Sequence, residues 1–390
     1  MDRIYEQTDK YIDRLISEST PDRPMWNIEK VRQGAGASWN YIDGCMLTAL
    51  LELWKITGKD KYFDFVKNFA DYFVTDEGDI LAYHPEKFRL DDINESRALF
   101  TLYKETGLEK YRLAIEKTEN QLRQQPRTCE GSFWHKGIYP NQVWLDGIYM
   151  AQVFNAMYEL EFGSGRIDDV LLQLKTVRSR MRDGKTGLYY HAYDASKKAF
   201  WADRATGCSG NFWLRALGWF AAALADLAGL TGERENLSSE RAYIGDLLDN
   251  LLESIAVYAD SETGMYMQIP DLPDREGNYL ETSGSCMIAY AMLKGARLGI
   301  CGSRTAELGT KTFRGIVENR LSFTDEGINL EGICLSAGLG PEDNRRRDGS
   351  FEYYMSEPVV KNDAKGVAPL ILCYTEAIRR QKQIYSNSAM

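Results

Sequence analysis

The sequence predicts an all-α fold, a barrel in which six inner helices are surrounded by six outer helices. One observation is a repeated helical pair, because residues 53–73 resemble residues 102–122 and their Thr-Gly pairs begin at 57 and 106, 49 residues apart. The other is that helices apolar on most faces alternate with charged helices. This alternation is typical of the inner and outer rings of a helical barrel.

Each copy of the repeat is expected to be a helix, a short turn and a second helix. Gly58 and Gly107 follow the last apolar position of the first helix, which is a usual stop signal. In the first copy, Phe65, Phe69 and Phe73 recur every four residues, as one face of an amphipathic helix requires.

Four further apolar helices bring the inner helix starts to six. They begin after Asp146, around Arg215, after Thr282 and after Lys365. Between the helical pairs, three short segments alternate like strands and are expected to form hairpin-like loops, at residues 183–194, 260–270 and 325–336. No low-complexity linker divides the chain, so residues 1–390 are expected to form a single barrel domain.

The composition limits partners and location. The 390 residues are 44% hydrophobic and carry a net charge of −10, which argues against nucleic acid or an acidic membrane surface as partner. Seven cysteines without a Cys-x-x-Cys pair indicate reduced thiols. There is no signal peptide pattern and no run that approaches the ~18 apolar residues of a membrane helix. A cytoplasmic monomer or weak homodimer is therefore expected.

If the inner helices run parallel, the residues at their N-terminal ends should line one pocket. These residues are aromatic, acidic, basic or hydroxylic, and the turns between helices add two histidines and a lysine: Trp39, Asn40, Tyr41, Asp91, Asp92, Trp144, Asp146, Trp213, Arg215, Thr282, Ser283, Asp363 and Lys365, with His135, Lys136 and His191. Singly, each has an ordinary role, as a helix cap, an ion-pair partner or a core aromatic. Six starts that repeat an aromatic with an acid or base favour a shared pocket.

Such a pocket suits an acidic sugar. Aromatic faces stack on sugar rings, and carboxylates, Asn and His meet hydroxyls. Lys136, Arg215 and Lys365 would supply positive charge that selects a carboxylate. The histidines lack metal-ligand spacing, and neither a phosphate loop, a dinucleotide fingerprint nor a Gly-x-Ser-x-Gly elbow is present, so no metal or cofactor is expected.

Several blocks of the sequence resemble one enzyme family. They are LDDINESRALFTLYKETG at 90–107, QPRTCEGSFWHKGIYPNQVWLDGIYMAQVF at 125–154, HAYD at 191–194, WADRATGCSGNFWLRALGWFAAALAD at 201–226 and KNDAKGVAPLILC at 361–373. From about Trp39 onward the chain resembles the unsaturated rhamnogalacturonyl hydrolases, glycoside hydrolase family 105, which are related to the unsaturated glucuronyl hydrolases of family 88. The Phe-Trp-His-Lys and Trp-Leu-Asp-Gly blocks are the most specific parts.

This resemblance implies an (α/α)6 barrel that hydrates a Δ4,5-unsaturated galacturonyl residue at the end of an oligosaccharide. The family's catalytic aspartate matches Asp146, which is expected to protonate C4 and to activate the water that adds at C5. The hemiketal then opens and releases the neighbouring sugar. The resemblance also places Asp91, His191, Arg215 and Trp219 in the pocket. Trp144 is expected to form its wall, and Gly147 to leave room for a sugar ring.

Two departures leave the exact substrate open. CSGNFWLRA and HAYD stand where relatives often show Pro after the Ser and Trp before the Asp. An unsaturated glucuronyl hydrolase acting on glycosaminoglycan- or ulvan-type oligosaccharides is one alternative. Others are a glycosidase that uses Asp91 with Asp146, an epimerase, which is disfavoured because the chain has three histidines, and a non-catalytic carbohydrate-binding barrel. Whether Asp91 or Asp92 faces the pocket also stays open.

Overall fold

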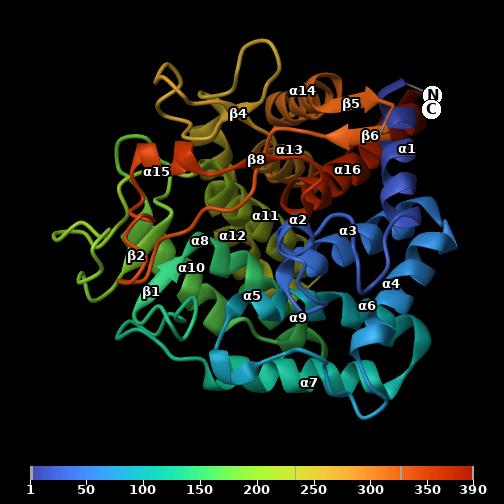
Figure 1. Ribbon diagram of the computed structural model, residues 1–390, viewed down its shortest axis with the longest axis horizontal. Helices are drawn as coiled ribbons and strands as arrows, with labels where there is room; N and C mark the ends of the chain where they lie inside the picture. The colour runs from blue at the N-terminus through green and yellow to red at the C-terminus, as the bar shows by residue number, and fades with distance from the viewer. Residues whose placement is uncertain (1–2, 233, 326, 389–390) are drawn as a thin grey trace.

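The computed structural model describes residues 3–232, 234–325 and 327–388, and over these ranges the chain is an (α/α)6 barrel (Figure 1). The described inner helices are α3 (Tyr41–Thr57), α6 (Arg97–Thr106), α9 (Val153–Glu161), α11 (Leu214–Thr231), α13 (Thr282–Arg297) and α16 (Ala364–Ser388). The described outer helices are α1 (Arg3–Ser17), α4 (Asp60–Phe73), α7 (Glu109–Gln124), α10 (Asp168–Met181), α12 (Ser238–Ala256) and α14 (Ser303–Arg320). The predicted fold class is confirmed.

Both glycines of the repeat end their helices as predicted. Gly58 and Gly107 stand directly after α3 and α6 with φ of 66° and 67°, a left-handed conformation that glycine adopts without Cβ strain. Glycine has a different use inside the inner ring. A Cβ on Gly284 of α13 would come 2.5 Å from the Leu214 side chain, so the missing side chain lets α11 and α13 approach closely.

The helix α11 is buried almost throughout. Among the described residues it is the one helix long and apolar enough to cross a membrane, and 89% of that window is buried inside the barrel. The expectation that no run would approach a membrane span was therefore wrong for residues 214–231. An inner helix surrounded by other helices needs apolar side chains on every face, which is the composition of a membrane span.

The ring closes between its first and last helices. The helix α16 packs against both α13 and α3, and α1 packs against α14 and α16. Tyr11 of α1 donates a hydrogen bond from its hydroxyl to Asn362 Oδ1, at 2.8 Å, just before α16 begins. The helix α1 therefore lies beside the start of α16.

Short elements fill the connections. The helical ones are α2 (Ile28–Gln33), α5 (Leu90–Ile93), α8 (Leu145–Gly147) and α15 (Phe351–Ser356), with 3-10 turns at Pro85–Lys87, Asn94–Ser96 and Glu235–Leu237 and a π turn at Ile148–Gln152. The described strands form antiparallel two-stranded ribbons: β1 (Gln142–Trp144) with β2 (Ala192–Asp194), β3 (Tyr266–Met267) with β4 (Leu280–Glu281), β5 (Leu321–Thr324) with β6 (Gly327–Leu330), and β7 (Ile333–Cys334) with β8 (Val359–Val360).

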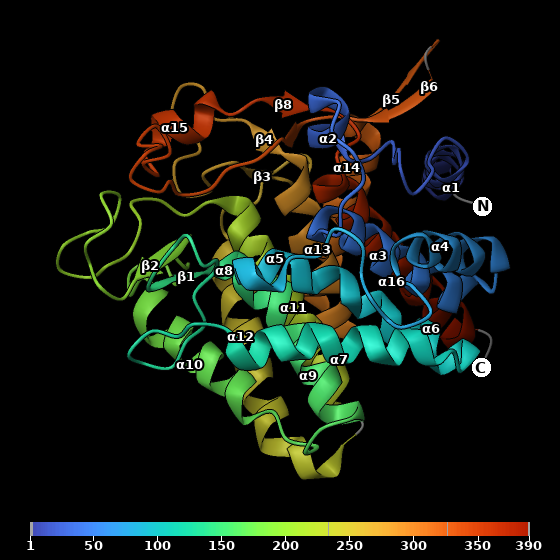
Figure 2. The ribbon, with the colours of Figure 1, turned by 60° about the horizontal axis from the view of Figure 1, so that its bottom comes forward.

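The three segments predicted to alternate like strands do contain strands, but those strands pair outside their own segment. For example, residues 183–194 contribute β2, which pairs with β1 from an earlier connection. The residue at 326, within the third predicted segment, lies outside the described residues. Figure 2 shows β3, β4, β8 and α15 gathered at one end of the barrel. This is the end at which the inner helices begin.

Candidate active site

A ribbon between two connections brings Asp146 and His191 together. In the β1–β2 pair, Trp144 lies opposite Ala192, and the backbone N–H of Leu145 donates to the His191 carbonyl at 3.1 Å. One residue after Leu145, Asp146 Oδ2 lies 3.3 Å from Nε2 of the same His191. Neither of these two buried atoms has a hydrogen-bond partner among the described residues. The Asp146 carboxylate therefore lies close to the His191 imidazole, but the two groups do not share a hydrogen bond.

Asp146 is not the cap of its helix. It is the second residue of α8, and the capping position is held by Trp144, whose side chain makes no capping bond. A π turn, Ile148–Gln152, follows at once. Such turns insert an extra residue into a helix and occur frequently at functional sites. The alternative that Asp146 serves only as a cap is therefore wrong.

His191 is oriented from its other nitrogen. Its Nδ1 lies 2.8 Å from the hydroxyl of Tyr354 on α15, and both side chains are fully buried. The imidazole also contacts the rings of Trp213 and Trp144, with centroids 4.7 and 5.3 Å away. These contacts fix the imidazole plane beside Asp146.

Asp91 joins the same cluster from α5. Its carboxylate pairs with Lys136 Nζ at 2.6 Å and lies 3.6 Å from His135 Nε2. The His135 ring stacks on Trp144 with centroids 4.5 Å apart. Burial alone would raise the pKa of Asp91, but Lys136 and His135 hold it below the ordinary value. Burial lowers the pKa of His135 to about 4, so this histidine is neutral near pH 7.

The neighbouring Asp92 has a different environment. Burial, and next the charge of Asp91, raise the pKa of Asp92 to about 7. Asp91, rather than Asp92, makes the ion pair with Lys136, so Asp91 is the carboxylate that belongs to the cluster.

Tyr41 and Trp219 lie on another side of the mouth. Their rings meet edge to face with centroids 6.4 Å apart, and Trp219 also packs on Tyr149 at 4.6 Å. Burial raises the pKa of Tyr41 well above its ordinary value, and the charges of Glu29 and Asp91 add to this. The Tyr41 hydroxyl is therefore neutral at physiological pH.

Arg215 and Lys365, which were expected to supply positive charge for a carboxylate, are each paired with carboxylates of the protein. Arg215 donates from Nε to Ser283 Oγ at 2.7 Å, also donates to the Cys334 carbonyl, and lies 3.6 Å from the Glu281 carboxylate. Lys365 Nζ lies 2.9 Å from Glu29 Oε1 and 3.0 Å from Asp363 Oδ1. Lys136 is likewise paired. Sequence alone could not reveal partners that the fold brings from other helices.

Two further expectations differ from the structure. Trp39 is set apart from the cluster, since its ring packs in the core against Phe73 of the outer helix α4. Gly147 leaves room for protein rather than for a sugar, because a Cβ there would come 3.1 Å from Leu90 Cδ1 and 3.2 Å from His135 Nδ1.

Two residues near the site were missed from the sequence. Tyr354 lies on α15, and Arg347 comes from the loop before it, where it donates from Nε to Gly338 O and Tyr353 Oη, both at 3.3 Å. A Cβ on Gly338 would come within 3.2 Å of the Trp144 ring and would clash with the guanidinium of Arg347, so this cation passes beside Trp144. The run NRRRD at 344–348 was the available signal.

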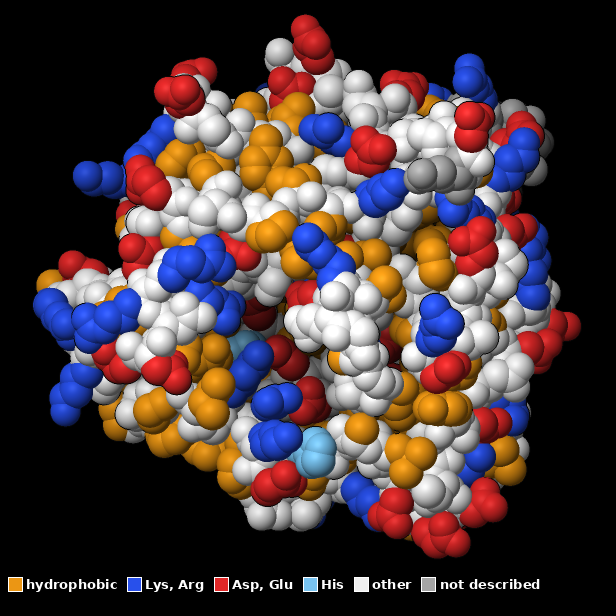
Figure 3. All heavy atoms as spheres, viewed as in Figure 1, with side chains coloured by type: hydrophobic (Ala, Val, Ile, Leu, Met, Phe, Trp, Pro, Cys, Tyr) orange, Lys and Arg blue, Asp and Glu red, His pale blue; other side chains and the backbone are white. Residues whose placement is uncertain are grey.

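The space-filling view shows the mouth as a hollow over α8 and α11 (Figure 3). Carboxylate and histidine side chains lie within it, and lysines and arginines stand at its edge. A model of one protein family, described as Glycosyl Hydrolase Family 88, matches residues 11–381.

The chain belongs to glycosyl hydrolase family 88. This family 88 protein is also similar to a glycoside hydrolase from family 105 of C. acetobutylicum ATCC 824, at 38% identity and a TM-score of 0.86, covering 95% of this chain and 98% of that one. It is 27% identical over 359 residues to the unsaturated rhamnogalacturonyl hydrolase YesR of Bacillus subtilis (strain 168), covering 89% of this chain and 92% of YesR.

A third relative is the 24.9 kDa protein in the picA locus of Rhizobium radiobacter. It is 38% identical over 231 residues, which is 57% of this chain and 97% of the relative. The predicted assignment to the family 88 and 105 group is confirmed. The protein is a glycoside hydrolase whose substrate is an oligosaccharide.

Proposed function

We propose that the protein hydrolyses Δ4,5-unsaturated galacturonyl oligosaccharides of the rhamnogalacturonan type, with Asp146 as both acid and base. The observation that carries this proposal is the Asp146 carboxylate, placed 3.3 Å from His191 and beside Trp144 at the barrel mouth. The name of the relative YesR supports the rhamnogalacturonyl substrate.

The reaction needs one carboxyl group in two states. The protonated Asp146 transfers its proton to C4, and the double-bond electrons form the new C–H bond while positive charge develops at C5. Water then adds to C5 and gives a proton back to the Asp146 carboxylate. The resulting hemiketal opens and releases the neighbouring sugar. The group ends in the state in which it began, so no further reactant is needed.

His191 can serve Asp146 in both states. Its Nε2 accepts a hydrogen bond from the carboxyl group or donates one to the carboxylate, depending on the tautomer. Its Nδ1 then takes the opposite role toward the Tyr354 hydroxyl, 2.8 Å away. Because a hydroxyl can both donate and accept, His191 Nδ1 keeps its hydrogen bond to Tyr354 in either tautomer.

Arg347 supports an acidic sugar. Among the described residues, Arg347 has no carboxylate within ion-pair distance, whereas Arg215, Lys136 and Lys365 are all paired. The guanidinium of Arg347 beside Trp144 is thus the cation free to bind the uronate carboxylate, which a planar fork of N–H groups suits.

The test follows the loss of the double bond's ultraviolet absorbance with unsaturated galacturonyl-rhamnose and, separately, an unsaturated glucuronyl disaccharide. The wild type should act faster on the first. Asp146→Asn should lose at least about a thousandfold in kcat, because the group can no longer transfer a proton. Asp168→Asn, on the outer helix α10, is the matched control and should keep full activity.

Three outcomes would reject the proposal or part of it. An undiminished rate in Asp146→Asn removes its acid and base role. A faster reaction on the glucuronyl substrate replaces the substrate. Saturable sugar binding without turnover by the wild type, measured by calorimetry, would make the barrel a binding protein.

A further inference from the structure

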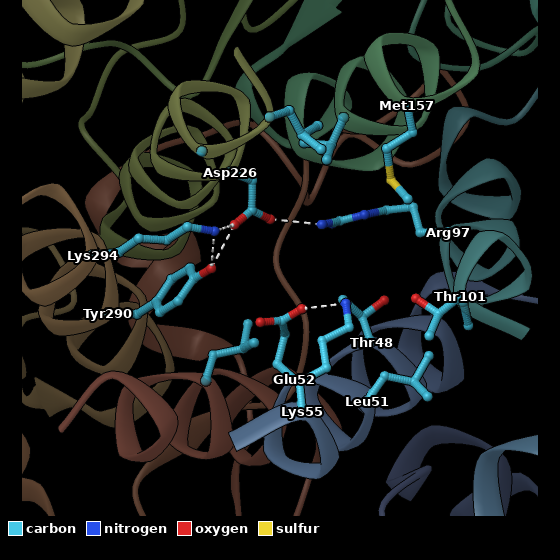
Figure 4. Close-up of a pocket in the computed structure, with 15 residues that line it drawn as sticks. Thr48, Leu51, Glu52, Lys55, Arg97, Thr101, Met157, Asp226, Tyr290 and Lys294 are labelled. Atoms are coloured by element: carbon cyan, nitrogen blue, oxygen red, sulfur yellow. Dashed lines mark hydrogen bonds and ion pairs between the residues drawn. The ribbon is translucent and has the colours of Figure 1, made fainter. Parts of the chain in front are cut away.

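A second cavity lies inside the inner ring, away from the mouth. Its volume is about 670 Å³ and includes open solvent. All six inner helices contribute to its lining, mostly from their middle and C-terminal turns, and Figure 4 shows these helices surrounding it. The half-exposed Lys55 is one of the lining residues, so the cavity is accessible from outside.

The carboxylates of this cavity are already engaged. Asp226 of α11 accepts hydrogen bonds from Arg97 Nη2 at 2.6 Å, Tyr290 Oη at 2.5 Å and Lys294 Nζ at 2.6 Å. Glu52 of α3 accepts one from Lys55 Nζ at 2.8 Å. The described lining thus holds the cations Lys55, Arg97 and Lys294 against two carboxylates, an excess of one positive charge.

Some hydrogen-bond donors of the cavity, in contrast, have no partner among the described residues. Arg97 is 6% exposed; its guanidinium lies close to the Tyr149 side chain, and its Nε and Nη1 are buried and make no hydrogen bond of ordinary geometry among the described residues. The hydroxyl of Thr48 on α3 is also buried and without a partner in that part of the chain. A buried donor without a partner destabilises the folded state, and more so when it is charged. The guanidinium face is closed by the Tyr149 ring at 4.8 Å, so only its edge offers N–H groups.

We propose that this cavity binds a small oxyanion, a carboxylate or phosphate group, on Arg97 and Thr48. Arg97 supplies separate N–H donors from Nε and Nη1, which lie on different edges of the guanidinium, and Thr48 adds an O–H donor. An oxyanion accepts charge-assisted hydrogen bonds from guanidinium N–H groups, which are stronger than hydrogen bonds between neutral groups. Figure 4 shows Arg97, Thr48 and Thr101 lying around the same space, with Asp226 at the far end of the Arg97 side chain. This site is separate from the hydrolysis proposed for Asp146.

Titration calorimetry with inorganic phosphate and, in a second series, acetate tests the site. One saturable event is expected in the wild type for at least one anion, and the preferred anion identifies the group. Arg97→Lys keeps the charge beside Asp226 but lacks the free Nε and Nη1 donors, and it should weaken binding about tenfold, the value of one charge-assisted hydrogen bond. Thr48→Val removes a hydroxyl that has no partner to lose, so it should fold normally and also bind more weakly.

Thr176→Val on the outer helix α10 is the matched control. It removes a threonine hydroxyl that bonds only its own helix, to Leu172 O at 3.1 Å, and it should leave affinity unchanged. Equal affinity in Thr48→Val and the wild type would overturn the proposal, as would the absence of saturable binding for both anions. Asp146→Asn should bind the anion normally, so a failure of the hydrolase proposal would leave this result standing.

Discussion

Asp146 depends on a residue that does not touch it. His191 lies between Asp146 and Tyr354, and the Tyr354 hydroxyl is the partner that orients the imidazole from its other nitrogen in either tautomer. Burial raises the pKa of Tyr354 well above its ordinary value, so the hydroxyl stays neutral in the working range. Tyr354 is therefore a positioning residue that acts through the imidazole.

Tyr354→Phe should lower kcat about tenfold while KM changes little. The phenyl ring keeps its packing on Trp213, whose centroid lies 6.0 Å away, but His191 loses its partner. Loss of the orienting group leaves substrate binding intact and weakens proton transfer. The pH profile of kcat should shift as well, which a packing defect would not cause. Tyr374→Phe is the control, because its hydroxyl bonds Asp9 at 3.0 Å on α1. An unchanged kcat in Tyr354→Phe would refute this role.

At the residue scale, the sequence indicated the polar and aromatic side chains next to helix starts. It did not indicate the residues from irregular connections that contact them. Asp91, Lys136, Trp144 and Asp146 stand beside regular elements, so their patterns indicated a shared mouth. Tyr354 and Arg347 come from an irregular connection without a period, and no local rule places such residues. The catalytic and binding roles themselves stay predictions.

At the scale of an element, the Glu281 side chain caps the N-terminus of α13. Its carboxylate accepts from the N–H groups of Ser283 and Gly284 at 3.1 and 2.7 Å, and it also accepts from the Cys334 N–H at 3.1 Å. Together with the Arg215 contact at 3.6 Å, these bonds join two inner helices and the β7 strand.

Glu281→Ala should lower the free energy of unfolding by about 3–5 kcal/mol. The substitution removes a helix cap and leaves the buried charge of Arg215 without its carboxylate. Urea unfolding followed by circular dichroism measures this loss. Ser350→Ala, which removes only the cap of α15, should cost about 1 kcal/mol. Equal losses in the two variants would show that Glu281 acts merely as a cap.

Helix starts and stops were predicted well because caps and apolar periods are local. Gly58 and Gly107 ended their helices where expected, and α13 begins at Thr282, one residue before the predicted start. The π turn after Asp146 and the β1–β2 ribbon depend on contacts between distant segments, so a local pattern could not show them.

For the whole molecule, two buried groups near the mouth, His135 and Asp92, make the free energy of unfolding depend on pH in opposite directions. The pKa of His135 falls from 6.5 to about 4, so between these values only the unfolded chain binds the proton, and stability rises with pH. The pKa of Asp92 rises from 3.8 to about 7, so in that window only the folded chain keeps the proton, and stability falls with pH.

Asp92→Asn should therefore gain stability relative to the wild type as the pH rises from about 4 to about 7, by about 3 kcal/mol in all. Urea unfolding at several pH values checks this. His135→Gln is the matched comparison, and its relative stability should change in the opposite direction up to about pH 6.5. A constant difference between Asp92→Asn and the wild type across this range would contradict the assignment.

The architecture was accessible from the sequence because a barrel of this kind repeats one local unit. The repeat at 53–73 and 102–122 and the alternation of apolar and charged helices were sufficient. The chain's division into domains, its cytoplasmic location and its monomeric or weakly dimeric state stay predictions.

The contact of α16 with α3 also has a meaning for biosynthesis. A ribosome makes the chain from its N-terminus, and α3 is among the earliest inner helices to emerge. Its apolar side facing α16 has no permanent neighbour until the last described inner helix has been translated. The nascent protein must therefore keep an unfinished ring from aggregating until α16 has emerged.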